Sequence, residues 1–209
     1  MIGRFGTYML NRRHSFAAAA FVFGAAAPRF AQAQPVDKAT AFVQQTGDKL
    51  TAIVNGNLGA VEKRRALTQI MEIAVDIDGI ARFCLGRFLR NASADQQKRY
   101  LAAFHEVLVT NIASKLGEYR GVKVSVQRAR MQEDDAIVTT TVERPNNPPT
   151  VVEWVIGQPG AAPRIVDVLA EGTSLRLTQR QDYAAYLSRN NNDVDALISA
   201  MKAQTAAGK

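Results

Sequence analysis

The spacing of apolar residues changes twice along this chain, and the two changes limit the folds that it can adopt. Before Gly121, apolar residues recur every three or four positions, as on one side of a helix. Between Gly121 and residue 169 they alternate within short β-rich segments, and after residue 173 the helical spacing returns. Strands that follow one another directly form antiparallel sheets, because a parallel pair needs a long crossover connection. The order favours one α+β domain, with helices packed on one face of a four-stranded antiparallel sheet.

Each predicted element has a range and, in places, a local signal. Helices are expected over residues 36–54, 60–74, 79–85, 93–119, 173–190 and 193–203, and strands over 122–126, 137–142, 151–156 and 164–169. Ser93 and Gln96 form a capping box at the start of the longest helix. Asp134 and Asp135 are expected in a hairpin turn between the first two strands.

The first 33 residues have the pattern of a secretory signal peptide. Arginines precede an apolar run over residues 16–27, and Ala31-Gln32-Ala33 supplies the small residues at which signal peptidase cuts. Four arginines lie in this segment, so cleavage would lower the formal net charge from +7 to +3. That charge is too small to favour a nucleic-acid partner. We therefore expect an exported domain over residues 34–209, with the Sec and twin-arginine routes both open because Arg12-Arg13 only approximates the twin-arginine motif.

Residues suited to catalysis or metal binding are scarce after the predicted cleavage site. Cys84 is the single cysteine, and it is interpreted as a small buried residue, with a reactive thiol as the alternative. His105 is expected on a helix surface or in helix packing, since zinc would need further ligands that no spacing offers. Asp76 and Asp78 are interpreted as an N-cap and a helix-dipole partner, with an acid–base pair as the alternative. We expect no catalytic residues, metal or cofactor, and hence no enzyme.

Apolar positions are numerous enough on the helices and strands to compete for one face of the sheet. They could form an ordinary solid core, or the helices and the sheet could stand apart and enclose an apolar pocket. Periodicity does not distinguish these two arrangements.

Three segments carry a resemblance to a known family. The first runs from Val75 to Arg90 and contains Asp-Ile-Asp and Leu-Gly-Arg-Phe, and the second runs from Ser93 to Phe104. The third is Val166–Leu175. Together they resemble the toluene-tolerance (MlaC) family over about residues 36–203, with departures at Cys84, Leu89 and Ala170.

The resemblance implies a roll-like fold that encloses an apolar cavity and holds the acyl chains of a phospholipid. It also implies a periplasmic carrier that moves lipid between an outer-membrane lipoprotein complex and an inner-membrane ABC transporter with an MCE-domain subunit. A hopanoid is the alternative ligand, because a related HpnM-like branch occurs with hopanoids. A non-enzymatic periplasmic adaptor with a closed core is the alternative of another class, and an enzyme on a similar roll is the third.

Ten apolar residues are predicted to line the cavity, each with an ordinary core position as the alternative. They are Phe83, Phe88, Phe104, Leu108, Ile112, Val138, Val152, Trp154, Ile165 and Val168. Arg87 and Arg90 are hypothesised to lie near the cavity mouth or a partner surface, with solvated helix charges as the alternative.

Overall fold

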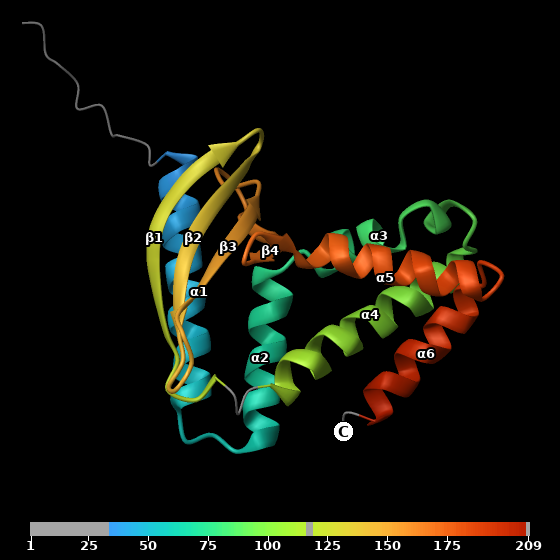
Figure 1. Cartoon of the computed structure of the whole chain (residues 1–209), viewed down its shortest axis with the longest axis horizontal. Helices are drawn as coiled ribbons and strands as arrows, with labels where there is room; N and C mark the ends of the chain where they lie inside the picture. The colour runs from blue at the N-terminus through green and yellow to red at the C-terminus, as the bar shows by residue number, and fades with distance from the viewer. Residues whose placement is uncertain (1–33, 116–118, 208–209) are drawn as a thin grey trace, which may run out of the picture. The chain divides into compact units, whose positions relative to one another are not determined.

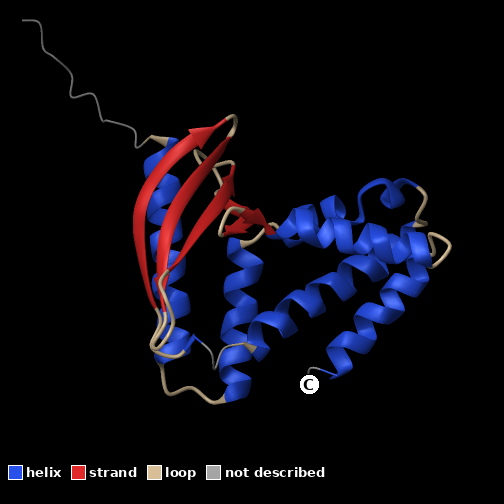
Figure 2. Cartoon of the chain, in the orientation of Figure 1, coloured by secondary structure: helices blue, strands red, loops and turns tan. Residues whose placement is uncertain are grey.

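The computed structural model describes residues 34–115 and 119–207, so the predicted signal peptide lies outside the described residues. Helices and strands occur in the predicted order, with the strands as one block between helices (Figures 1 and 2). The helices are α1 (Pro35–Asn55), α2 (Ala60–Ala74), α3 (Ile77–Leu85), the 3-10 helix η1 (Gly86–Arg90), α4 (Ala94–Ser114), α5 (Leu175–Arg189) and α6 (Val194–Ala207). The strands are β1 (Lys123–Gln132), β2 (Asp135–Glu143), β3 (Thr150–Gly157), β4 (Arg164–Ala170) and β5 (Thr173–Ser174).

The strands form one antiparallel sheet in the order β1-β2-β3-β4-β5, so every neighbour in the sheet is also a neighbour in sequence. The prediction of four strands was wrong by one. Thr173 and Ser174 were expected in a helix but pair with Ala170 and Leu169. Glu171 and Gly172 turn the chain between them, both with positive φ. A strand of two residues is too short to show an alternation of apolar and polar residues, so the sequence pattern did not reveal it.

Two predicted boundaries also differ from the structure. Helix α4 ends at Ser114 and not at Tyr119, because the backbone N–H of Lys115 bonds to Ile112 O three residues back and tightens the last turn. Strand β1 extends to Gln132 and contains a bulge between Val126 and Arg128. A bulge adds one residue and shifts the side-chain alternation, so the β1 pattern is not regular in the sequence.

The helix starts follow the predicted caps. The Oδ1 atom of Asp76 accepts the N–H of Gly79 at 3.0 Å, and this bond caps α3. A Cβ atom at position 79 would meet the Asp76 carboxylate, so a larger residue there would force this capping side chain to shift. At α4, Ser93 Oγ accepts the Gln96 N–H at 3.1 Å, and Gln96 Oε1 accepts the Ser93 N–H at 2.9 Å. Both the N-cap at Asp76 and the capping box at Ser93 are confirmed.

Buried apolar side chains form two clusters and not one continuous core. The sheet cluster joins Ala39 and Val43 of α1 to the inner face of the sheet, which is the face that α1 covers. Its core residues are Ala39, Val43, Ala74, Ala136, Val138, Ile156 and Ile165. The helical cluster is built from α3, η1, α4, α5 and α6, together with Met71 of α2. Half-buried Val75 lies at the margin of both clusters. The fold therefore places the two clusters side by side, with α2 in contact with α1 on one side and α4 on the other.

Candidate functional site

Part of the inner face of the sheet is apolar but not covered by α1. Trp154 and Val168 lie opposite each other on β3 and β4, and both are half buried at the margin of the sheet cluster. The indole N–H of Trp154 donates to Thr140 Oγ1 at 2.9 Å, and that hydroxyl donates to Val152 O at 3.3 Å. The tryptophan is thus held in one orientation, with its ring on the apolar face.

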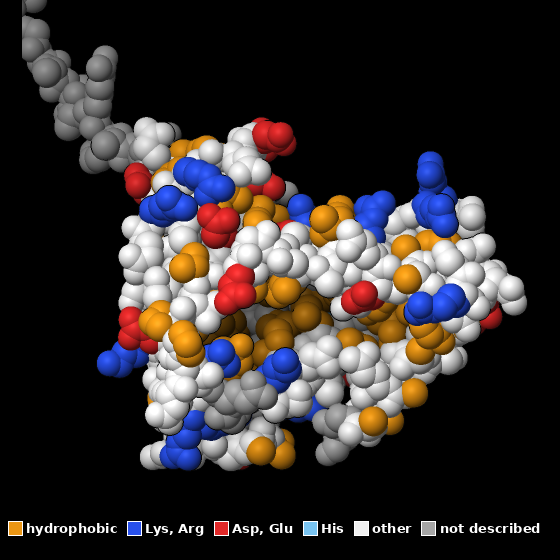
Figure 3. All heavy atoms as spheres, viewed as in Figure 1, with side chains coloured by type: hydrophobic (Ala, Val, Ile, Leu, Met, Phe, Trp, Pro, Cys, Tyr) orange, Lys and Arg blue, Asp and Glu red, His pale blue; other side chains and the backbone are white. Residues whose placement is uncertain are grey.

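An apolar hollow lies between the strands and the helices. Figure 3 shows hydrophobic side chains on its floor, with strands at the left and helices at the right. One end of α2 is attached to the sheet: Asp76 N donates to Ile165 O at 3.0 Å, and an Arg164 N–H donates to Glu72 O at 2.8 Å. Val75 also forms a parallel bridge with Ile165. The C-terminal end of α2 is therefore fixed to β4 by two backbone contacts and by the Arg164 guanidinium.

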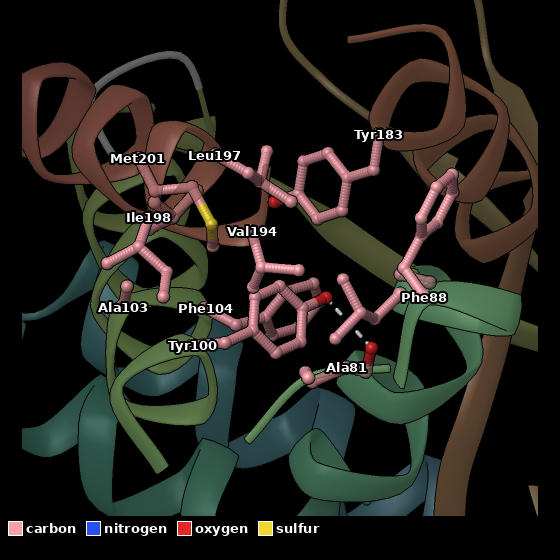
Figure 4. Close-up of a cluster of buried hydrophobic side chains, with 14 of the residues drawn as sticks. Ala81, Phe88, Tyr100, Ala103, Phe104, Tyr183, Val194, Leu197, Ile198 and Met201 are labelled. Carbon is pink, nitrogen blue, oxygen red and sulfur yellow. Dashed lines mark hydrogen bonds between the residues drawn. The ribbon is translucent and has the colours of Figure 1, made fainter. Parts of the chain in front are cut away.

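The helical cluster is packed solidly. The rings of Tyr100, Phe104 and Tyr183 lie 6.1–6.3 Å apart between centroids, and the Tyr100 hydroxyl donates to Ala81 O at 2.8 Å (Figure 4). Residues of α6, among them Leu197, Ile198 and Met201, complete the cluster and are each 2% exposed (Figure 4). A second pocket, of about 430 Å³, opens beside α5 and α6 and is lined in part by Tyr183, Leu197 and Met201.

The structure divides the ten predicted cavity residues among different places. Four belong to the helical cluster or its margin, namely Phe83, Phe88, Phe104 and Leu108. Four belong to the sheet cluster or its margin, namely Val138, Trp154, Ile165 and Val168. Val152 lies on the inner face of β3 between Thr140 and Ala170, and Ile112 on α4 is 38% exposed.

Burial separates these residues further. Phe88, Phe104, Val138 and Ile165 are at most 6% exposed and pack as core residues do. Half-buried Phe83 has its ring beneath two guanidinium groups, with Arg176 at 4.7 Å and Arg180 at 4.8 Å from the ring centroid. Leu108, Val152, Trp154 and Val168 are half buried. Of the ten predicted residues, those with accessible apolar surface beside the sheet belong to this group. Lipid contact by any of the ten remains a prediction.

A basic pocket of about 700 Å³ opens at the other end of α2, and sequence reasoning missed it. Its lining comes from the end of α1, the start of α2, the end of α4 and Arg120. Among the described residues, three that line the pocket are charged, and all three are cations: Lys63, Arg64 and Arg120. The run Lys63-Arg64-Arg65 was the available signal in the sequence, but a charge run usually marks a solvated face. None of the ten predicted residues lines this pocket.

The family follows from comparison with known proteins. The sequence model of the MlaC protein family matches residues 44–203, which is well over half of the chain. The chain belongs to the MlaC family. A curated MlaC-like relative, toluene tolerance protein Ttg2D of Pseudomonas putida, is 25% identical over 146 residues, 69% of this chain and 68% of the relative. The predicted resemblance is confirmed.

A solved structure shares the fold. It is a phospholipid-binding protein from Ralstonia solanacearum, in complex with a phospholipid, and it superposes with a TM-score of 0.70 at 22% identity. The match covers 81% of this chain and 98% of the other. This chain therefore has the α+β fold of that solved structure.

Cys84 and His105, the residues that could have indicated catalysis, lie in a buried position and on a helix surface. Burial, and secondarily the charge of Asp167, raises the pKa of the Cys84 thiol to about 12, and its Sγ donates to Arg176 O. His105 lies on α4 with its Nε2 3.9 Å from Glu72 Oε1, and both side chains are more than a third exposed. Within residues 34–115 and 119–207, no group of three or more His, Cys, Asp or Glu side chains could hold a metal ion.

The two hypothesised arginines lie on η1, away from the basic pocket. Arg87 and Arg90 are exposed, and the Arg87 guanidinium lies 4.9 Å from the centroid of the Phe88 ring. Neither residue lines the basic pocket. No helix in the described part of the chain is long and apolar enough to cross a membrane.

Proposed function

We propose that this protein is a periplasmic lipid carrier that holds the acyl chains of a phospholipid in the apolar hollow between the sheet and the helices. The observation that carries the proposal is the apolar hollow between the strands and the helices (Figure 3). Half-buried Trp154 and Val168 lie on the inner face of the sheet, at the margin of the sheet cluster. Family membership supports it, and so does the phospholipid that the Ralstonia protein of the same fold binds.

The energetics suit a carrier that exchanges its cargo. Burial of one CH₂ group contributes about 0.8 kcal/mol, so a sixteen-carbon chain contributes about 12 kcal/mol in total. A bilayer offers nearly the same burial, so lipid leaves the carrier easily at a membrane but not into water. Such hand-off makes and breaks no covalent bond, and the positions of Cys84, His105 and the two aspartates at α3 are consistent with this.

The compartment and the partners are part of the same proposal. Residues 1–33 direct export, and the carrier moves lipid between an outer-membrane lipoprotein complex and an inner-membrane ABC transporter with an MCE-domain subunit. Mass spectrometry of the exported protein tests the proposed export signal, because cleavage after Ala33 leaves Gln34 as the first residue. An exported protein that keeps residues 1–33 would contradict it.

The single tryptophan of the chain provides a direct test of the site. Phospholipids brominated on their acyl chains should quench Trp154 fluorescence strongly, because bromine quenches only at close range. The same lipids without bromine are the control and should change the emission little. Lipid that binds without bromine quenching would place the acyl chains elsewhere.

Native mass spectrometry of the purified protein separates the alternatives. An adduct with the mass of a phospholipid supports the carrier proposal, and a hopanoid mass would replace the ligand while keeping the carrier. Protein that is repeatedly free of lipid and takes none up from vesicles would instead favour a periplasmic adaptor with a closed core.

A further inference from the structure

The basic pocket lies at the opposite end of α2 from the contacts that join this helix to the sheet. Those contacts involve the C-terminal residues of α2 and strand β4, whereas Ala60 and Val61 at the helix start line the pocket. The helix has 15 residues, so it is about 22 Å long at 1.5 Å per residue. One leaflet of a bilayer has a hydrocarbon depth of about 15 Å. The distance along α2 is thus sufficient for an acyl chain whose polar end lies at the pocket.

Two of the three cations of the pocket donate to neutral groups. Lys63 Nζ donates to Val54 O at 2.8 Å, and an N–H of Arg64 donates to Thr110 Oγ1 at 2.9 Å. Thr110 is 3% exposed, so Arg64 is anchored at the α2–α4 contact. Among the described residues, no ion pair joins Lys63, Arg64 or Arg120 to a carboxylate. Within the described part of the chain, these three positive charges thus have no carboxylate partner and can attract an anion.

One acidic side chain lies near this end of the helix. The Glu62 carboxylate folds back over Gly59, close to where a Cβ atom would stand, and Glu62 is not among the residues that line the pocket. It offsets part of the positive field, but it leaves the lining itself basic.

Apolar side chains stand beside the cations. Val54 is buried in the lining, while Leu58 and Val61 at the opening are 49% and 80% exposed. Figure 3 shows Lys or Arg side chains directly below the apolar hollow. Cations next to apolar surface match an amphiphile at the boundary between its phosphate and its chains, and a pocket of about 700 Å³ is far larger than one phosphate ion needs.

We propose that the basic pocket binds the phosphate of an anionic glycerophospholipid and makes the carrier prefer anionic over zwitterionic lipid. This inference rests on the proposed function. Three cations attract the phosphodiester of any phospholipid, but they repel the ammonium group of phosphatidylethanolamine, and phosphatidylglycerol carries no such group.

The test compares three proteins that are loaded from vesicles with equal amounts of phosphatidylglycerol and phosphatidylethanolamine of identical chains. The pocket variant is Lys63→Gln/Arg120→Gln, which spares the anchored Arg64. The control is Arg65→Gln/Lys202→Gln, which removes the same charge at exposed positions outside the pocket. Extraction and mass spectrometry give the lipid ratio, and circular dichroism on heating checks that each variant folds.

Wild type and control should be enriched about two- to fivefold in phosphatidylglycerol, as expected for partly exposed ion pairs, and the pocket variant should approach the ratio of the vesicles. An unchanged preference in the pocket variant, or no preference in wild type, overturns the inference while the carrier proposal stands. Absence of both lipids from all three proteins overturns the carrier proposal, and the inference with it.

Glycerol phosphate distinguishes a lipid head group from a free phosphate. At millimolar concentration it should not displace bound lipid, because the acyl chains supply most of the affinity. Displacement of the lipid would mean that the pocket is a site for a soluble phosphate ester, and it would overturn the assignment to a lipid.

Discussion

Tyr100 shows how a single side chain can organise the helical cluster. It is fully buried, contacts the rings of Phe104 and Tyr183, and donates its hydroxyl to Ala81 O at 2.8 Å. Burial raises the pKa of Tyr100, so the hydroxyl keeps its proton and remains a donor. This bond joins α4 to α3 across the densest part of the molecule (Figure 4).

Tyr100→Phe should therefore lower the free energy of unfolding by about 1 kcal/mol, since a buried donor is lost while the ring is kept. Urea denaturation measures the change. Tyr186→Phe is the matched control, because its hydroxyl lies 3.4 Å from Ala196 O in a half-buried position, and a smaller loss is expected there. Equal losses in the two variants would contradict the role assigned to Tyr100.

At the scale of elements, a polar contact fastens the start of α6 to the start of α4. Gln96 Nε2 donates to Asp195 Oδ2 at 2.9 Å, and an N–H of Arg99 donates to Asp195 Oδ1. The hydrogen bonds from Gln96 and then Arg99 lower the pKa of Asp195 below its usual range. The contact is accessible to solvent, so its contribution to stability is small and is reduced by salt.

The sign of the pH dependence follows from this lowered pKa. Asp195 stabilises the fold above the unfolded pKa of about 3.9, and this stabilisation is lost as the pH falls through the lower folded pKa. The urea concentration at the unfolding midpoint should therefore fall more below about pH 4 in wild type than in Asp195→Asn. Asp134→Asn, in the exposed β1–β2 turn, is the control. The same pH slope in Asp195→Asn and wild type would contradict the prediction.

At the scale of the whole domain, the apolar residues belong to two clusters with an apolar surface left between them. The sheet cluster takes its helical residues from α1 and from Ala74 of α2, and the core of the helical cluster contains no residue of the sheet. Val152 stands on the part of the inner face that remains, opposite Thr140 and Ala170. Extra volume there should fill space that a ligand needs.

Val152→Trp should therefore reduce the amount of lipid bound several-fold with little loss of stability. Val151→Trp is the matched control, because Val151 is the neighbouring residue on the opposite face and is 52% exposed. Lipid extraction with thermal unfolding gives both quantities. A normal lipid load together with a large drop in melting temperature would show that Val152 is a core residue.

Features that depend on nearby residues were predictable from the sequence. The order of helices and strands, the Asp76 cap, the Ser93 capping box and the hairpin turn at Asp134 each depend on side chains within a few positions of one another. The family motifs are equally local. Strand β5 and the bulge in β1 were missed, because one is too short and the other interrupts the alternation.

The candidate site could be predicted only in part. The sequence identified Trp154, Val168 and Val152 as apolar strand positions but could not separate them from Phe88 and Phe104, which the helical cluster encloses. Apolar character is a property of the residue, whereas accessibility depends on which helix covers it.

By itself, the sequence determined the fold class, the antiparallel character of the sheet and the family, because periodicity, caps and motifs act over short separations. Only the tertiary structure decided that the apolar residues form two clusters, and that Lys63, Arg64 and Arg120 share one pocket. Those outcomes depend on contacts between segments far apart in the chain, such as α4 with α6 and α1 with the sheet. Their geometry is set by packing, which no local pattern records.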